Sequence, residues 1–300
     1  MKKKTYLFAL MAMVLTLGSC SDNENGIGGE TSKYITVSTS IGNMTRVATD
    51  AKGGQTFEEG DEISVYAWTG APTVAPETSE RVVNNAINKL TNGSWVSTPQ
   101  MLWKNNRDKH YFIGVYPTAA ISDLSAGEYT FDANKQTESD LLVAVNPDGL
   151  SYSADAQQTV PLTFTHVMAK LVVNLTYKNQ WGGIPTVEKV VVGNAAKEAT
   201  INYLTKVVTP STTAKEDFSL PEITENAKYV SVIIPQEDVK QLTIVIGGKN
   251  FVYDNGTPFK LESGKITTVN LEVGRDEIKL GDVKITNWED GSTFSGEALN

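Results

Sequence analysis

Apolar and polar residues alternate with a period of two over much of this 300-residue chain, and this pattern constrains the fold more than any other feature. In residues 34–41, Ile35 and Val37 fall on one face of an extended chain, opposite hydroxyl residues. Residues 63–68 and 268–273 alternate in the same way. Because successive side chains of a strand point to opposite faces, each segment predicts a β-strand with one face on a core.

Other segments are apolar on both faces and are separated by turn residues. These runs predict central strands that are covered on both sides: residues 111–116, 141–145, 190–192 and 230–234. Gly247-Gly248 between two strand-like runs predicts a tight hairpin, and Asn146-Pro-Asp-Gly149 predicts a second turn. About a dozen short strands at this spacing predict an all-β fold, organised as two β-sandwiches in tandem.

Two segments depart from the strand pattern. Val83, Ile87 and Leu90 recur at helical spacing in residues 81–90, which predicts a short helix. Residues 205–225 hold two prolines and a run of Ser and Thr, which predicts a long polar connection. Both would interrupt an otherwise extended architecture.

The first twenty residues carry the features of an export signal. Three lysines precede an apolar run at residues 6–17, which is shorter than the roughly 20 residues of a membrane-spanning helix. The run ends in Leu-Gly-Ser-Cys20, which resembles the lipobox of bacterial lipoproteins, where signal peptidase cuts before the cysteine and the thiol receives a diacylglycerol. Cys20 is the only cysteine of the chain, so it has no partner for an internal disulfide. The alternative is an incidental thiol in an ordinary cleaved signal.

Residues 1–19 are therefore expected to be a lipoprotein signal peptide, and residues 20–32 the lipidated cysteine with a flexible tether. Asp22 and Glu24 resemble the acidic export signals of Bacteroidota surface lipoproteins, which implies a surface-exposed protein anchored by lipid in the outer membrane. A linker that faces the periplasm is the alternative. About 280 residues remain, enough for two domains of roughly 100–200 residues each. We place the boundary between them at residues 156–160.

Composition excludes several classes of function. A net charge of −9 leaves no basic patch for nucleic acid. The two histidines, His110 and His166, are far apart in sequence and lack the Cys/His spacing of a metal site. His166 lies between apolar Phe164 and Met168, which favours a hydrogen-bonded structural histidine over a ligand. With no candidate nucleophile, acid–base pair or phosphate loop, we expect neither an enzyme nor a bound cofactor.

Six segments, in order along the chain, resemble the fimbrillin family of Bacteroidota, the Mfa-like group. They are F-E-E-G-D-E-I-S-V-Y-A at residues 57–67, W…Y-F…V-Y-P at 103–117, D-L-L-V-A at 140–144, L-T-F-T-H-V-M-A-K-L at 162–171, residues 259–273 with their Gly-Lys pair, and I-T-N-W at 285–288. The fourth match is the most specific. Together they cover nearly the whole chain after the lipobox.

The resemblance implies two transthyretin-like, Greek-key β-sandwich domains, over residues 33–158 and 159–300. It implies a lipoprotein that is built into pili or related surface fibres, supports cell adhesion, and has other pilin subunits and a host or bacterial surface ligand as partners. It also implies extended or loop structure at residues 81–90, and we prefer this to the short helical period. His166 is a structural position in the family, and the resemblance assigns it no catalysis.

The family further suggests how subunits join. An arginine-directed protease removes the N-terminal segment with its first strand, and the opened groove accepts a strand from the next subunit. Arg46 follows the predicted first strand in a position that resembles this cleavage site, so a cut between Arg46 and Val47 would release both lipid and strand. The alternative is an ordinary surface arginine. Residues 283–300 are the candidate donor strand, with three apolar positions at Val283, Ile285 and Phe294. Stalk, tip and anchor roles all remain open.

A surface glycan-binding lipoprotein is the main alternative function, because such proteins share the lipobox, the acidic tether and the β-sandwich domains. It would need exposed aromatic side chains gathered on one face, for example Trp95, Trp103 and Trp181. Because these residues are scattered in the sequence, most of them are expected to lie in or beside a core.

Overall fold

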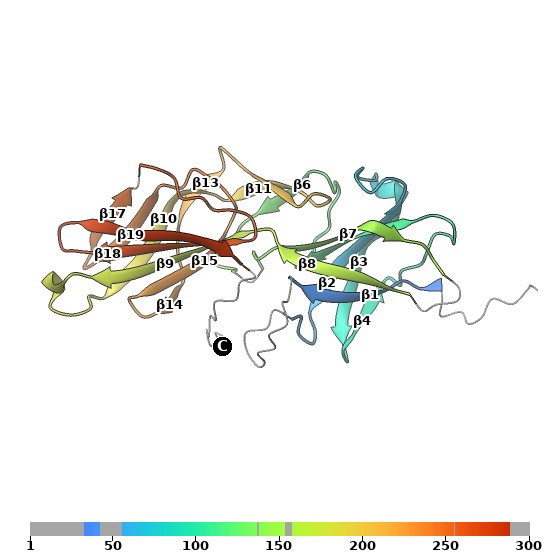
Figure 1. Cartoon of the computed structure of the whole chain (residues 1–300), viewed down its shortest axis with the longest axis horizontal. Coiled ribbons are helices and arrows are strands. Elements are labelled where there is room, and N and C mark those ends of the chain that lie inside the picture. Colours follow the sequence, from blue (N-terminus) through green and yellow to red (C-terminus); the bar gives the residue numbers. More distant parts are fainter. Residues whose placement is uncertain (1–32, 43–55, 137, 154–157, 255, 289–300) are drawn as a thin grey trace, which may run out of the picture.

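The structure, a computed structural model, describes most of the chain: residues 33–42, 56–136, 138–153, 158–254 and 256–288. In these residues the strands form four sheets, and helical structure amounts to short 3-10 segments, among them the turns at Thr78–Glu80 and Asn179–Trp181. The predicted all-β class is therefore confirmed. Figure 1 shows an elongated molecule, with the first half of the chain at one end and the second half at the other.

A seven-stranded sheet forms most of the first half. Its spatial order is β1 (Thr36–Ile41), β8 (Thr159–His166), β7 (Leu142–Leu150), β5 (His110–Tyr116), β2 (Glu62–Thr69), β3 (Arg81–Thr91) and β4 (Ser94–Thr98). β1 runs parallel to β8, and the other neighbours are antiparallel. The sheet curls until its two edges approach each other. The Ile35 amide, just before β1, donates to the carbonyl of Met101, which follows β4, at 3.0 Å. The sheet thereby encloses a core of its own.

Two further sheets form the second half. The five-stranded sheet has the order β14 (Glu222–Thr224), β15 (Lys228–Ile233), β9 (Ala169–Tyr177), β18 (Lys265–Val273) and β19 (Ile278–Asn287). The four-stranded sheet has the order β13 (Lys215–Ser219), β10 (Val187–Ala196), β16 (Gln241–Ile246) and β17 (Lys249–Asp254). Buried side chains of both sheets, such as Leu171, Val190 and Ile244, belong to one continuous core. This is the arrangement of a β-sandwich.

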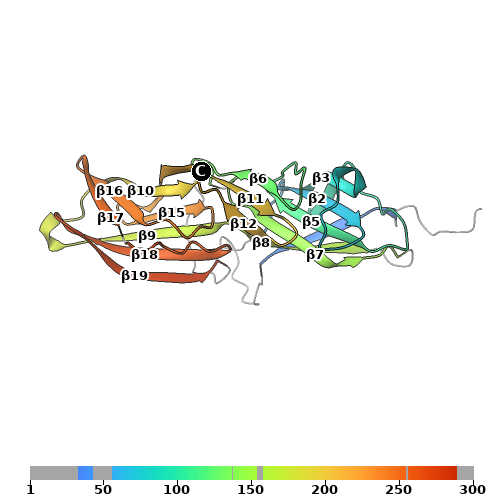
Figure 2. The ribbon, with the colours of Figure 1, turned by 90° about the horizontal axis from the view of Figure 1, so that it is seen from above.

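A three-stranded sheet links the two halves. β6 (Gly127–Thr130), from the first half of the chain, pairs with β11 (Glu198–Asn202), which pairs in turn with β12 (Val207–Pro210). Figure 2 shows these strands between the two larger groups. The larger core also runs from Tyr66 and Ile113 of the first half into the second, so the halves share buried surface.

The helix predicted at residues 81–90 is wrong, and the extended structure implied by the resemblance is right, because this segment forms β3. Its ladder to β2 shifts register near Asn85, which has a φ of 55°. Because of the bulge, buried Val83 and buried Ala86 lie on the same face although they are three positions apart instead of two. A strand with a bulge therefore imitated helical spacing.

Two other local predictions are also wrong. Asn146-Pro-Asp-Gly149 is not a turn but part of β7, at an irregular stretch of its ladder to β5. Residues 205–225 carry β12, β13 and β14 rather than a structureless connection. In β13 only Phe218 is buried, which explains the polar sequence of these edge strands. The Gly247-Gly248 hairpin is confirmed between β16 and β17, with φ values of 57° and 72°.

The change from one large sheet to another lies later in the chain than residues 156–160. β8, which begins at Thr159, hydrogen-bonds to β1 and β7 in the seven-stranded sheet. The next strand, β9, belongs to the five-stranded sheet. The switch therefore falls between His166 and Ala169, and the division into tandem domains stays a prediction.

Candidate functional site: two edge strands

β1 closes the seven-stranded sheet between two distant parts of the chain. It pairs in parallel with β8, from Thr36 opposite Thr159 to Ile41 opposite Phe164. Parallel neighbours need a long connection rather than a tight turn, so β1 enters the sheet as a separate segment. On its other side, Trp95 Nε1 donates to Thr39 Oγ1 at 3.0 Å. We call the space that β1 fills, between β8 and residues 95–103, the β1 groove.

The side chains of β1 and of the residue before it help to fill the core of the first half. Ile35 and Val37 are only 2% and 6% exposed, which confirms the alternation predicted for this segment. They share their core with fully buried Phe164 and with Leu162 of β8. Burying an Ile or Val side chain contributes about 1.5–3 kcal/mol each. Loss of β1 would therefore expose an apolar groove as well as the backbone edge of β8.

The described part of this segment ends at Gly42, whose amide donates to the Phe164 carbonyl at 2.7 Å. Arg46 and Val47, the predicted processing site, lie outside the described residues, as do Cys20 and Phe294. Their roles stay predictions.

β19 is the second edge strand, and it carries two of the predicted donor residues. It pairs antiparallel with β18 along its length, with Val283 opposite Val269 and Ile285 opposite Thr267. Val283 and Ile285 are 40% and 38% exposed. No described strand pairs with the outer edge of β19. The strand therefore offers both backbone groups and apolar side chains to a neighbour.

The end of β19 is held by one large side chain. The Trp288 ring stacks on the His166 imidazole, with centroids 4.1 Å apart and planes 6° from parallel. Lys170 Nζ lies 5.2 Å from the centroid of the same ring. His166 Nδ1 lies 2.8 Å from Asp140 Oδ1, which fixes the imidazole from behind. We call these four residues the Trp288 site.

The Trp288 site is a buried polar cluster where β8, β9 and β19 meet. Trp288 is 5% exposed, and its amide donates to the Gly264 carbonyl at 3.0 Å. Burial lowers the pKa of Lys170, and the nearby Asp140 charge partly opposes this shift. Among the described residues His166 Nε2 is buried without a hydrogen-bond partner. The sequence favoured a structural role for His166, but nothing in it indicated the contact with Trp288.

The three tryptophans considered for glycan binding pack in different places. Trp95 lies edge-on to Phe57 at 5.3 Å and Trp103 edge-on to His110 at 5.0 Å, and both contact the core of the first half. Trp181 lies against Phe251, at 5.7 Å, on the core that extends through the second half. They therefore do not form one shared platform.

In the part of the chain that the structure describes, no group of three or more His, Cys, Asp or Glu residues is placed to hold a metal ion. Within the same residues, no helix has the length and apolar character needed to cross a membrane.

These features define the class: an all-β protein of β-sandwich type, with one edge strand near each end of its described chain. The chain belongs to the fimbrillin-like family, whose family model matches residues 45–288. No curated protein sequence matches it.

Several solved structures share the fold. A proposed cell adhesion protein of Bacteroides ovatus aligns with a TM-score of 0.64 and 18% identity, over 85% of this chain and 98% of its own. Another such protein, of Bacteroides uniformis, aligns with a TM-score of 0.61 and 20% identity, over 78% of this chain and 94% of its own. The tip fimbrial protein Mfa3 of Porphyromonas gingivalis, with a C-terminal truncation, aligns with a TM-score of 0.50 and 12% identity. The alignment covers 77% of this chain and 95% of the Mfa3 chain. At these identities the likeness establishes the fold.

Proposed function

We propose that this chain is a structural subunit of a surface pilus, exported as a lipoprotein through Cys20 and assembled with other pilin subunits by strand exchange. Membership of the fimbrillin-like family supports the pilus role, and the related folds include proteins described as fimbrial or as adhesion proteins. The observation that carries the mechanism is β1, an edge strand that helps to fill a core and precedes Arg46.

Cleavage after Arg46 removes residues 1–46, and β1 leaves with them. The β1 groove then presents the unpaired edge of β8 over an apolar floor, which a strand from another copy can fill. A strand that replaces β1 needs apolar side chains two residues apart, as Ile35 and Val37 are. Val283 and Ile285 have the same spacing and are already partly exposed. This match supports β19 and the residues after it as the donor.

Controlled proteolysis tests the processing step. The full chain in detergent is treated with an arginine-specific protease, beside Arg46→Ala and the matched loop variant Arg107→Ala. Wild type and Arg107→Ala are expected to gain an N-terminus at Val47 and to form high-mass ladders on gels of unboiled samples. Arg46→Ala is expected to keep its N-terminus and remain monomeric. Ladders of equal strength in Arg46→Ala would contradict the proposal.

Two changes at the C-terminal end test the donor. Deleting residues 283–300 is expected to abolish polymerisation, but it also removes Trp288. The double variant Val283→Ser/Ile285→Ser keeps Trp288 and alters only the exposed positions, so it separates donation from stability. Polymerisation of the cleaved chain should fall in both variants. Undiminished polymerisation of both would rule out this segment as the donor.

A further inference from the structure

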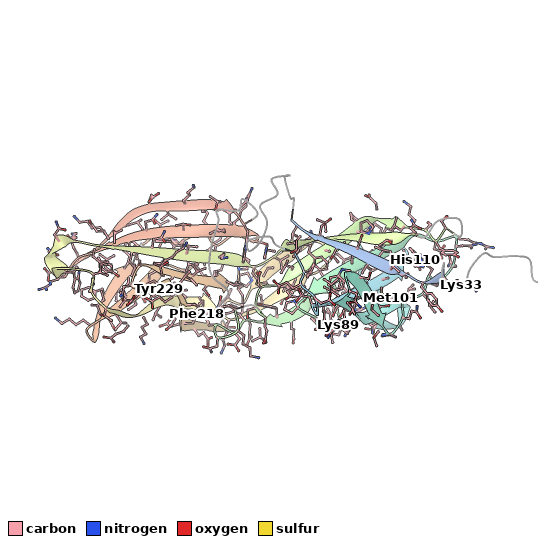
Figure 3. All side chains as sticks on the ribbon, turned by 90° about the horizontal axis from the view of Figure 1, so that it is seen from below. Lys33, Lys89, Met101, His110, Phe218 and Tyr229 are labelled. Carbon is pink, nitrogen blue, oxygen red and sulfur yellow. The ribbon has the colours of Figure 1, made fainter. Side chains whose placement is uncertain are left out.

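A hollow of about 320 Å³ lies at the free end of the first half, beside the starts of β1 and β5. Figure 3 shows Lys33 and His110 at this end of the molecule, away from Phe218 and Tyr229 in the second half. We call it the tip cup, and six residues line it: Lys33, Leu102, Trp103, Asn105, Asn106 and Tyr152. It combines apolar and aromatic walls with a few polar groups, which is the usual composition of a small-ligand site.

Two aromatic rings form the walls of the tip cup. The Trp103 and Tyr152 rings lie 6.3 Å apart and are inclined by 45° to each other. Trp103 is fixed from behind by edge-to-face contacts with His110 and Phe112, at 5.0 and 5.7 Å. A fixed, inclined ring pair suits a ligand that has flat apolar faces and polar edges, as a sugar ring does.

The loop of residues 104–109 forms the polar rim, and His110 holds it in place. His110 Nε2 accepts the Lys104 amide at 3.0 Å, so Nδ1 carries the proton and donates to the Asp108 carbonyl at 3.1 Å. Burial lowers the pKa of His110, which keeps the imidazole neutral in this arrangement. Within the loop, Asn105 Oδ1 accepts the Arg107 and Asp108 amides, both at 2.8 Å. Asn105 Nδ2 also donates to Asp108 Oδ2 at 2.7 Å, so the Asn105 side chain holds the loop, and exposed Asn106 is the lining amide that we assign to the ligand.

The charge around the tip cup is opposite to that of the whole protein. The chain carries a net charge of −9. Among the six described residues that line the cup, Lys33 is the one charged side chain, and it is cationic. A local positive field in an acidic protein favours an anionic ligand.

We propose that the tip cup binds a carboxylate-bearing sugar, such as a uronic or sialic acid unit of a surface glycan. The sugar ring packs on the open side of the inclined Trp103–Tyr152 pair, its hydroxyls hydrogen-bond with the Asn106 amide, and its carboxylate pairs with Lys33. This site does not take part in strand exchange. Because Lys33 precedes Arg46, cleavage there would remove the cation, so the preference for acid belongs to the uncleaved chain.

A matched pair of ligands tests the inference. The full chain in detergent, at low salt, is titrated with methyl glucuronide and methyl glucoside, which differ by the carboxylate, and with N-acetylneuraminic acid. Binding is followed by saturation-transfer NMR and tryptophan fluorescence. At least one acidic sugar is expected to bind about fivefold or more tightly than the glucoside, with a preference that weakens as salt rises.

Variants locate the binding. Lys33→Met and Asn106→Asp alter exposed rim positions and should remove the preference for acid, while Tyr152→Ala should abolish binding. Trp181→Ala, a comparable aromatic change in the other half, should leave binding intact. The proposal is overturned if neither acidic sugar binds, if methyl glucoside binds equally well, or if all three rim and wall variants bind as wild type does.

Discussion

β1 and β19 are both edge strands near the ends of the described chain, yet they are held in opposite ways. The segment of β1 buries Ile35 and Val37 at 2% and 6% exposure, whereas β19 leaves Val283 and Ile285 at 40% and 38%. β1 closes a curled sheet, and β19 lies on the rim of a sandwich that is complete beneath it. Both strands are paired through their backbones, so backbone pairing does not distinguish them. What decides whether the fold needs an edge strand is how much of the core its side chains cover.

The difference also concerns where each strand is anchored. The apolar contacts of β1 are spread along the strand and the residue before it. Those of β19 lie near its two ends: Ile278 and Leu280 pack against the core at its start, and Trp288 lies just beyond its last residue. Between these ends, Val283 and Ile285 are partly exposed, and this stretch is held mainly by its backbone ladder to β18. This makes β19 the better candidate to leave its own subunit, and β1 the better candidate to leave a groove behind.

Trp288→Ala is expected to have the largest effect on stability, about 3–5 kcal/mol of unfolding free energy, because it removes a buried ring and its stack on His166. Urea unfolding followed by circular dichroism measures it. Trp288→Phe keeps an aromatic ring over His166 and should lose clearly less. If Trp288→Ala lowers the unfolding free energy by less than about 1 kcal/mol, the Trp288 side chain is not what holds the end of β19.

Ile35→Ala should cost about 2–5 kcal/mol, because it leaves a cavity in the core of the first half. Ser38→Ala, an exposed position of the same strand, serves as the control and should change stability by less than about 0.5 kcal/mol. The same urea unfolding compares the two. Equal effects would show that the side chains of β1 do not stabilise the sheet, and the contrast with β19 would fail.

Much of the fold could be predicted from the sequence wherever regular alternation matched a regular strand. The segment around Ile35 and Val37 and the hairpin at Gly247-Gly248 are such cases. Prediction failed where the ladder is irregular: the bulge at Asn85 imitated a helix, and the stretch ending at Gly149 imitated a turn. Bulges shift the phase of side-chain burial, and only the partner strand reveals the shift.

The candidate sites were less predictable, because their parts are far apart in the sequence. Family resemblance pointed to the segments that contain His166 and Trp288, but not to the stack between them. The tip cup brings Lys33, the loop after Trp103 and Tyr152 together, and this juxtaposition depends on the entry of β1 between β4 and β8. No local pattern contains that information.

Ile285→Ala should change the free energy of unfolding by no more than about 1 kcal/mol, because the side chain is already partly in solvent. The same substitution should slow polymerisation of the cleaved chain if the side chain enters the β1 groove of a neighbour. Urea unfolding and the rate of ladder formation are measured on one preparation. A loss of stability as large as that of Ile35→Ala would remove the difference between the two strands.

The smallest expected effect is a pH dependence that arises at the tip, near the start of β1. Burial lowers the pKa of His110, so the unfolded chain takes up a proton near the ordinary histidine value of about 6.5 while the folded chain does not. The His110 contribution is therefore complete above that pH and is lost as the pH falls toward the lowered pKa. His110→Gln should be less stable at neutral pH but should lose less stability between pH 7 and 5.5. The carboxylates titrate in both proteins, so the difference between the urea midpoints of wild type and His110→Gln isolates the effect of His110. If the two midpoints change in parallel with pH, this assignment is wrong.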